Sequence, residues 1–180
     1  GPYPGDEYIT VLDGGFTIVD AAQAPIVSAR AGDSVTFRNG APSSWKQDGY
    51  LRKIYLTLQD REGPVPQIAS ADGGFQVLAP DRRPQGAPDS DGVTREVIFC
   101  NAAGTMTVTL CRFPACNLPP ELGPTHRLIR VLAGAITLTG AGNPPDTFAA
   151  ESHVFLPRGT AGRWELAADT VAIIVDVTAA

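Results

Sequence analysis

The sequence of 180 residues predicts an all-β fold built from two copies of one unit. Residues 9–17 align with residues 129–137, about 120 positions later, with the same Ile, Val, Leu, Gly and Thr at corresponding places. Four further residues of the first copy recur in the second: Val35, Gly40, Trp45 and Ile54 correspond to Val154, Gly159, Trp164 and Ile173. A repeat of this length is too long for a solenoid unit and has the size of a small duplicated domain.

Short runs rich in β-branched and aromatic residues, separated by Gly, Pro or Asn-Gly turns, predict the strands. In the first copy these runs cover residues 8–19, with a turn at 13–15, and then residues 34–38 and 51–58. In the second copy they cover residues 94–100, 105–113, 126–132, 136–139, 153–156 and 170–177. No segment has the periodicity of an amphipathic helix, and many short strands with regular turns are typical of a β-barrel or sandwich.

The composition along the chain predicts three parts. Residues 1–60 form a first unit, residues 61–92 form a linker rich in Gly, Pro, Asp and Ser, and residues 93–180 form a second unit. The second unit opens with two strands that have no counterpart before the first copy, so we expect the first barrel to be incomplete. Either upstream residues supply the missing strands, or the apolar segment 75–78 of the linker folds back and covers the open edge.

Charge and cysteine usage exclude several classes of partner. The formal net charge of −5 argues against nucleic acid and anionic membranes, and no apolar run is long enough to span a bilayer. Cys100, Cys111 and Cys116 lack a recognisable zinc spacing. We therefore expect three reduced, mostly buried thiols in a cytoplasmic protein.

The order of motifs in both copies resembles a cupin. The first copy carries the segments 11–14, 32–40, 45–46 and 52–55, which read Val-Leu-Asp-Gly, Gly-Asp-Ser-Val-Thr-Phe-Arg-Asn-Gly, Trp-Lys and Arg-Lys-Ile-Tyr. The second copy carries segments 131–134 and 153–159 and Trp164. The chain is therefore similar to a bicupin of the RmlC-like jelly-roll type, and in particular to the branch that includes ureidoglycine aminohydrolase and the ethanolamine-utilisation cupins. This resemblance implies two cupin-type barrels, the first without its N-terminal strands.

The resemblance also implies where a cupin metal site would lie, and most of its ligands are replaced. In the first copy Glu7 occupies the usual Glu position, Ser43 the late His position, and the paired His positions fall on residues 1–3, which are Gly-Pro-Tyr. In the second copy Arg127 occupies the Glu position, Gly162 the late His position, and the paired His positions fall near Glu121 and Gly123. A cation at a ligand position opposes a divalent ion. We expect no metal or other cofactor.

Six residues are candidates for a ligand site. Arg127 points into the barrel and serves either as a structural ion-pair partner, for example of Glu121, or as an anchor for a carboxylate or phosphate. Glu7 is either an acid or base, or a partner of Arg52 or Lys53 at the rim. The remaining candidates also have structural interpretations. Trp45 and Trp164 either fill the cores of their barrels or form aromatic walls that stack a ligand, and His126 is a rim residue.

Two functions remain open at this point. The first is a small-molecule enzyme, a hydrolase or isomerase of the cupin type, acting on a polar metabolite that carries a carboxylate. The second is a non-catalytic cupin that binds a ligand or serves in oligomerisation. The fold alone does not decide between them. In either case the open edge of the first barrel favours a homodimer.

Overall fold

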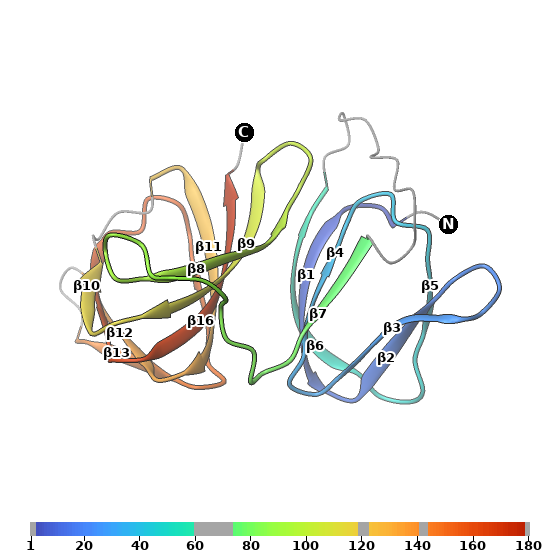
Figure 1. Ribbon diagram of the computed structural model, residues 1–180, viewed down its shortest axis with the longest axis horizontal. Coiled ribbons are helices and arrows are strands. Elements are labelled where there is room, and N and C mark those ends of the chain that lie inside the picture. The colour runs from blue at the N-terminus through green and yellow to red at the C-terminus, as the bar shows by residue number, and fades with distance from the viewer. Residues whose placement is uncertain (1–2, 60–73, 119–122, 141–143, 179–180) are drawn as a thin grey trace. The chain divides into compact units, whose positions relative to one another are not determined.

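The computed structural model describes residues 3–59, 74–118, 123–140 and 144–178, which hold sixteen strands and no α-helix. The chain divides into two units, residues 1–82 and 83–180 (Figure 1). Each unit is a cupin-type β-barrel formed by two sheets that face each other across a hydrophobic core. The expected all-β fold is therefore confirmed. No helix in the described part of the chain is long and apolar enough to cross a membrane.

Unit 1 contains a four-stranded sheet and a three-stranded sheet, both antiparallel. The first has the order β6-β1-β4-β7, with strands Arg52–Leu58, Asp6–Asp13, Ser34–Phe37 and Phe75–Leu78. The second has the order β3-β2-β5, with strands Pro25–Arg30, Gly15–Val19 and Ser44–Lys46. Alternate residues of each strand face the core, since side chains alternate across a strand. Those core residues include Ile9, Val11, Phe16, Ile18, Val35 and Phe37.

Unit 2 repeats this arrangement with additional strands. Its larger sheet has the order β14-β11-β16-β9-β8, with strands His153–Leu156, Thr125–Ala133, Thr170–Thr178, Met106–Phe113 and Thr94–Cys100. Its second sheet has the order β10-β15-β12-β13, with strands Cys116–Leu118, Gly162–Leu166, Ala135–Gly140 and Asp146–Ala149. Ile129, Val131, Ile136, Val154 and Trp164 are among the buried residues between the two sheets.

The strand registers of the two units match at the positions that the sequence repeat aligns. Ile9 pairs with Val35 in unit 1, and Ile129 pairs with Val154 at the same place in unit 2. Both β1 and β11 shift register at a β-bulge just before the turn into the next strand. Gly14 and Gly134 follow these bulges with φ of 76° and 75°, a backbone conformation that glycine adopts without strain. The two units therefore correspond in backbone conformation as well as in strand register.

The two units differ at the edges of their larger sheets. Strand β16 lies between β11 and β9, whereas its counterpart β6 has only β1 as a neighbour among the described strands. Segment Phe75–Leu78 does form a strand, β7, but it pairs with β4 at the opposite edge of the sheet (Figure 1). The segment thus folds back onto unit 1, but the expected alternative that it covers the open edge is wrong, because it pairs with the other edge of the sheet. The described part of unit 1 leaves β6 as an edge strand.

Candidate functional site

Glu7 and Lys53 form an ion pair on the interior face of unit 1. Glu7 lies on β1 between Phe37 of β4 and Thr57 of β6, and Lys53 lies on β6 opposite Val11. Residues directly opposite each other in an antiparallel pair share a face, so Glu7 and Lys53 both face the core side of the sheet. The Nζ atom of Lys53 is 3.5 Å from Oε1 of Glu7. Of the two partners that the sequence left open for Glu7, the structure shows Lys53.

Two aromatic rings frame this ion pair. The Lys53 Nζ atom lies 4.8 Å from the ring centre of Tyr55 and 5.2 Å from that of Trp45, within cation–π range. Trp45 is stacked on Phe16 with 3.9 Å between ring centres. Both Trp45, which is 37% exposed, and Tyr55, which is 59% exposed, are accessible to solvent. We call Glu7, Lys53, Trp45 and Tyr55 the Glu7 site.

The two charges of the Glu7 site differ in their access to water. The Lys53 side chain is 28% exposed, whereas the Glu7 side chain is only 4% exposed. Burial raises the pKa of Glu7 above its ordinary value, and this effect exceeds the opposing influence of Lys53 and the Thr57 hydroxyl. The site therefore presents an accessible ammonium group backed by a buried carboxyl that gains a proton more readily than a carboxyl in water.

Arg127 occupies the same position in unit 2 but has a different partner arrangement. It lies opposite Asp176 of β16, and its Nε and Nη2 atoms donate hydrogen bonds to the two carboxylate oxygens at 2.6 and 2.9 Å. The guanidinium also lies over the Trp164 ring, 5.8 Å from its centre. A bidentate pair of this kind satisfies both charges. This geometry supports the structural ion-pair interpretation of Arg127, with Asp176 as partner; Glu121 lies outside the described residues.

The two tryptophans of the repeat have opposite environments. Trp164 is 3% exposed and belongs to the core of unit 2, in agreement with the prediction that it fills the core of its barrel. Trp45 is more than a third exposed, so the same expectation is wrong for it. The strands explain the difference: β15, which carries Trp164, lies between β12 and β10, whereas β5 pairs only with β2 among the described strands. Trp45 therefore forms an open wall of the Glu7 site.

Neither histidine joins the Glu7 site or the Arg127 pair. His126 is half-buried on the outer face of β11, where its Nδ1 accepts a hydrogen bond from the Arg158 backbone N–H at 3.2 Å and its ring stacks on Phe155. This position agrees with the rim position expected for His126. His153 starts β14, and burial together with Arg130 lowers its pKa to about 4, so it is neutral near pH 7.

The described residues do not fit the metal ion that cupins commonly hold. At the position of the usual carboxylate ligand, Glu7 is paired with an ammonium group in unit 1, and unit 2 has the Arg127 guanidinium. Nowhere in the described ranges do three or more His, Cys, Asp or Glu side chains converge as a metal site requires. A fixed cation beside a single carboxylate opposes binding of a divalent ion.

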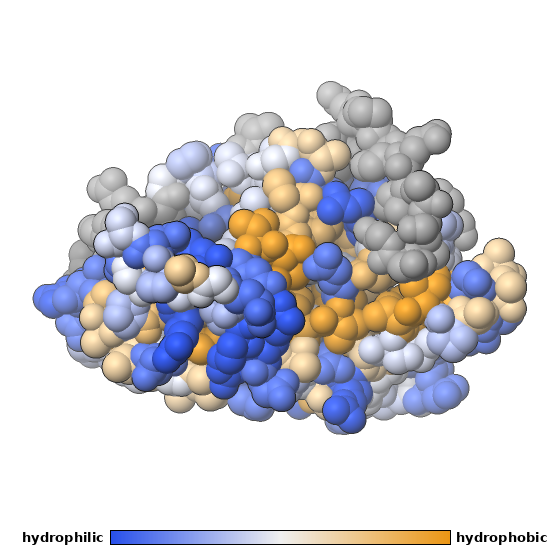
Figure 2. All heavy atoms as spheres, in the orientation of Figure 1, coloured by the Kyte–Doolittle hydropathy of each residue, from blue (hydrophilic) through white to orange (hydrophobic). Residues whose placement is uncertain are grey.

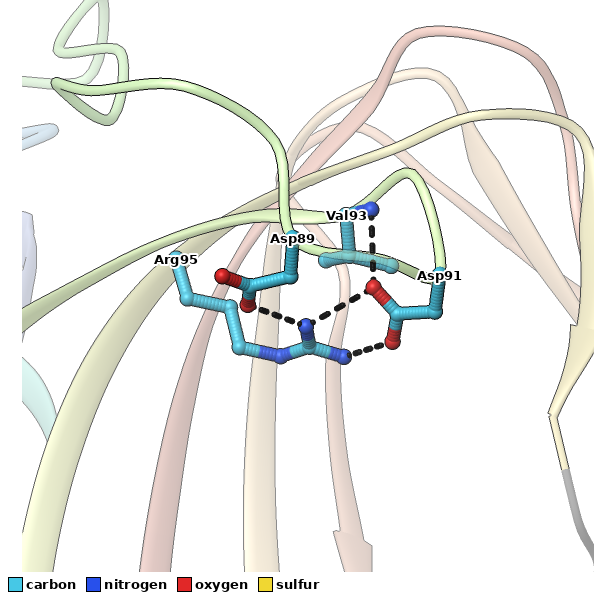
Figure 3. Close-up of polar contacts among 4 residues, drawn as sticks. All are labelled: Asp89, Asp91, Val93 and Arg95. Atoms are coloured by element: carbon cyan, nitrogen blue, oxygen red, sulfur yellow. Dashed lines mark hydrogen bonds and ion pairs between the residues drawn. The ribbon is translucent and has the colours of Figure 1, made fainter.

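An acidic cluster in unit 2 is a structural clamp. Arg95 of β8 donates hydrogen bonds to Asp89 at 2.7 Å and to both oxygens of Asp91 at 2.6 and 3.0 Å, and Asp91 also accepts from the Val93 backbone N–H (Figure 3). The hydrogen bonds from Arg95 lower the pKa of Asp91 to about 2. All of these contacts are within one loop and the strand that follows it, so they hold the backbone in place where β8 begins.

The cysteines only partly match the expected burial. Cys111 is buried in the core of unit 2, and burial raises its pKa to about 11, which makes it a poor nucleophile. Cys116 is half-buried, and Cys100 is exposed, contrary to the expectation of mostly buried thiols. All three are free thiols.

A hollow of about 500 Å³ lies along β2, β3 and β5 of unit 1, adjacent to the Glu7 site, since its lining residue Phe16 stacks on Trp45. Its polar lining includes Thr17, Ser28 and Lys46, but the hydroxyls of Thr17 and Ser28 bond to each other at 2.9 Å. Gln23 and Asp48 line the hollow as well, so its polar groups include both a cation and a carboxylate. On the face drawn in Figure 2, hydrophilic residues predominate over the strands of unit 2, and a hydrophobic patch lies over strands of unit 1.

Comparisons with known proteins agree with the cupin fold. The profile of the EutQ-like cupin domain family matches residues 2–55. A Pseudomonas syringae pv. tomato protein of unknown function is similar over 98% of this chain and 75% of its own, with a TM-score of 0.77 and 16% identity. A cupin 2 conserved barrel domain protein from Leptotrichia buccalis covers 98% of this chain and 74% of its own, with a TM-score of 0.67 and 15% identity. No curated protein matches the sequence. The chain is a cupin-fold protein.

Proposed function

We propose that this cupin-fold protein binds a small polar metabolite through a carboxylate, and that it does so at the Glu7 site. The observation that carries the proposal is the Lys53 ammonium group, which is partly exposed and flanked by the accessible rings of Trp45 and Tyr55. An ammonium group offers three donors, and among the described residues Glu7 is the carboxylate that pairs with it. The remaining donors point to a charge-assisted contact with an anion.

The geometry favours binding in unit 1 over binding in unit 2. The Arg127 guanidinium already uses two of its N–H groups in a bidentate contact with Asp176. Trp164 beneath it is buried and leaves no aromatic surface for a ligand. In this proposal the ligand carboxylate is therefore bound by Lys53, and not by Arg127 as the sequence suggested.

Burial of Glu7 favours binding over acid–base catalysis. A general acid or base must come within hydrogen-bond reach of the reacting atoms. The Glu7 side chain is nearly inaccessible, and Lys53 is the exposed member of the pair. We therefore favour the non-catalytic interpretation over a hydrolase or isomerase. The similarity to the ureidoglycine aminohydrolase branch supports a carboxylate-bearing ligand without requiring catalysis.

We further infer that the chain is a bicupin and forms a homodimer. The matching registers of the two units and their bulges support a duplicated cupin. Strand β6 has one neighbour among the described strands, whereas β16 has two, and an unpaired edge gains main-chain hydrogen bonds when another strand covers it.

Binding at the Glu7 site is tested by NMR titration of the whole chain with acetate, glycolate and benzoate. The indole N–H signal of Trp45 should shift on binding, while that of the buried Trp164 should not. Lys53→Met should abolish the shift. Lys46→Met is the matched control, because it removes the same charge from an exposed neighbouring residue of β5 that lies in the adjacent hollow. Absence of binding to the wild-type chain, or equal binding by the Lys53→Met variant, overturns the proposal.

A further inference from the structure

We infer that the Glu7 site takes up a carboxylic acid in net neutral form, with the carboxylate on Lys53 and one proton on Glu7. The inference rests on the proposed function and specifies the ligand class further. It follows from the way the two charges of the site depend on each other.

Lys53 is the charged group that faces Glu7. On β1 the flanking Asp6 and Tyr8 point to the other face of the strand, and the Asp6 carboxylate accepts a hydrogen bond from the Asn39 backbone N–H. From β4, Glu7 is faced by Phe37; from β6, by Thr57 and Lys53. On β5 the aromatic Trp45 lies near Lys53, and its neighbour Lys46 lies in the adjacent hollow. Among the described residues, the charge of Glu7 is therefore balanced by one cation.

A ligand carboxylate competes with Glu7 for that cation. Once the Lys53 ammonium turns to the ligand, the Glu7 carboxylate is left buried with less compensation. A buried carboxylate without a partner is costly and becomes neutral instead. Burial already raises the pKa of Glu7 before any ligand arrives, so this carboxyl takes up a proton more readily than a carboxyl in water. Binding an anion should therefore draw one proton from solvent onto Glu7.

The exposure of the two groups favours a simple acid over a zwitterion. An amino acid could satisfy both charges without a proton if its ammonium group reached Glu7. That carboxyl is 4% exposed, whereas Lys53 is 28% exposed, so the accessible half of the pair recognises anions only. A proton reaches Glu7 where an ammonium group does not.

The test is the pH dependence of acetate binding to the whole chain, followed through the Trp45 indole signal between about pH 5.5 and 8. Acetate is ionised across this range, so any pH dependence belongs to the protein. Linkage requires the affinity to fall about tenfold per pH unit between the pKa of Glu7 in the free protein and its pKa in the complex. In Glu7→Gln the affinity should no longer vary with pH and should exceed that of the wild type at pH 8. Glycine, the zwitterion of similar size, should bind more weakly than acetate.

The outcomes separate this inference from the proposed function. If acetate binds the wild-type chain with an affinity that does not vary with pH, proton uptake is wrong while binding at Lys53 stands. If glycine binds as tightly as acetate, the preference for a simple acid is wrong. If acetate does not shift the Trp45 signal at any pH, the proposed function fails and this inference fails with it. The wild-type measurement decides the matter even if Glu7→Gln does not fold, and Lys46→Met should keep the wild-type pH dependence.

Discussion

Glu7 and Arg127 occupy the same position in the two units and carry opposite charges. Each lies seven residues before a turn glycine with positive φ, and each faces a residue of the neighbouring long strand, Thr57 or Asp176. The equivalence was predicted from the repeat and is confirmed by the registers. Opposite charges at one position require different partners. The partner of Glu7 is Lys53, which lies further along β6 than the directly opposite Thr57, whereas the partner of Arg127 is the directly opposite Asp176.

The turn glycines provide a matched pair for testing how tightly unit 2 is packed. Gly134 and Gly159 have nearly equal φ, 75° and 74°, so alanine is strained similarly at both. A Cβ at Gly134 would lie 2.5 Å from Thr170 Oγ1 and 2.8 Å from its Cα, whereas at Gly159 nothing lies within 4 Å. We expect Gly159→Ala to lower the free energy of unfolding by about 1 kcal/mol and Gly134→Ala by about 3 kcal/mol or more. Urea denaturation measures both, and equal losses would show that Thr170 moves freely.

The repeat predicted the fold better than it predicted the site. The long strands were recognised close to their observed ends, and Thr94–Cys100 matches the prediction at both ends, as does the short strand His153–Leu156. The strands β3, β5, β10, β13 and β15 were not assigned, because each has only three to six residues, and runs this short often carry too little alternation to predict a strand. Trp45 shows the consequence for the site. It matches Trp164 in sequence, yet its exposure depends on whether a strand such as β10 lies beside it.

For a related reason Lys53 was indicated only as one of two possible partners of Glu7, and Asp176 was not indicated at all. Lys53 lies within the strand-like run Arg52-Lys53-Ile54-Tyr55, where a lysine is ordinarily a solvated edge residue. Its partner Glu7 is 46 positions away, and Asp176 is 49 positions from Arg127, so neither pair shows a local spacing. Only the strand register brings these charges together. The alternation of side chains along the strands did indicate such partners, since an inward-facing charge on one strand requires a partner on the next strand.

The Arg127–Asp176 pair should stabilise unit 2 measurably. Both side chains are about three-quarters buried, at 24% and 27% exposed, and the contact is bidentate. Removing one partner leaves a partly buried charge, so we expect Asp176→Asn to cost about 2 kcal/mol. In a double-mutant cycle with Arg127→Met, the coupling energy should be about 1 to 2 kcal/mol.

The exposed Arg112–Asp169 pair is the control for that cycle. Its side chains are 57% and 75% exposed, so solvent screens the interaction. A cycle with Arg112→Met and Asp169→Asn should give a coupling energy below about 0.5 kcal/mol. Equal coupling in the two cycles would mean that burial adds nothing to the Arg127 pair.

His153 should make the protein less stable in mild acid. Its pKa in the folded state is about 4, below the ordinary value of 6.5, because burial disfavours the imidazolium. Between these two values the unfolded chain binds the proton more readily, so the free energy of unfolding should decrease as the pH falls from about 6.5 to 4. His153→Gln should reduce this decrease. The measurement is a set of urea denaturation curves at several pH values; identical pH profiles for wild type and variant would contradict the assignment.

The homodimer prediction depends on strand β6. Its counterpart β16 is hydrogen-bonded on both sides, and the sheet of unit 2 continues to β9 and β8. Edge strands with free N–H and C=O groups tend to pair with other strands unless charged residues or prolines prevent it. Strand β6 has Ile54, Leu56 and Leu58 on one face, and its two charged residues, Arg52 and Lys53, both lie at its start. A two-fold axis beside β6 would let the same edge of two copies pair. Light scattering at micromolar concentration should give twice the chain mass of 18.9 kDa. A mass of one chain across the concentration range would show that β6 is not an interface between copies.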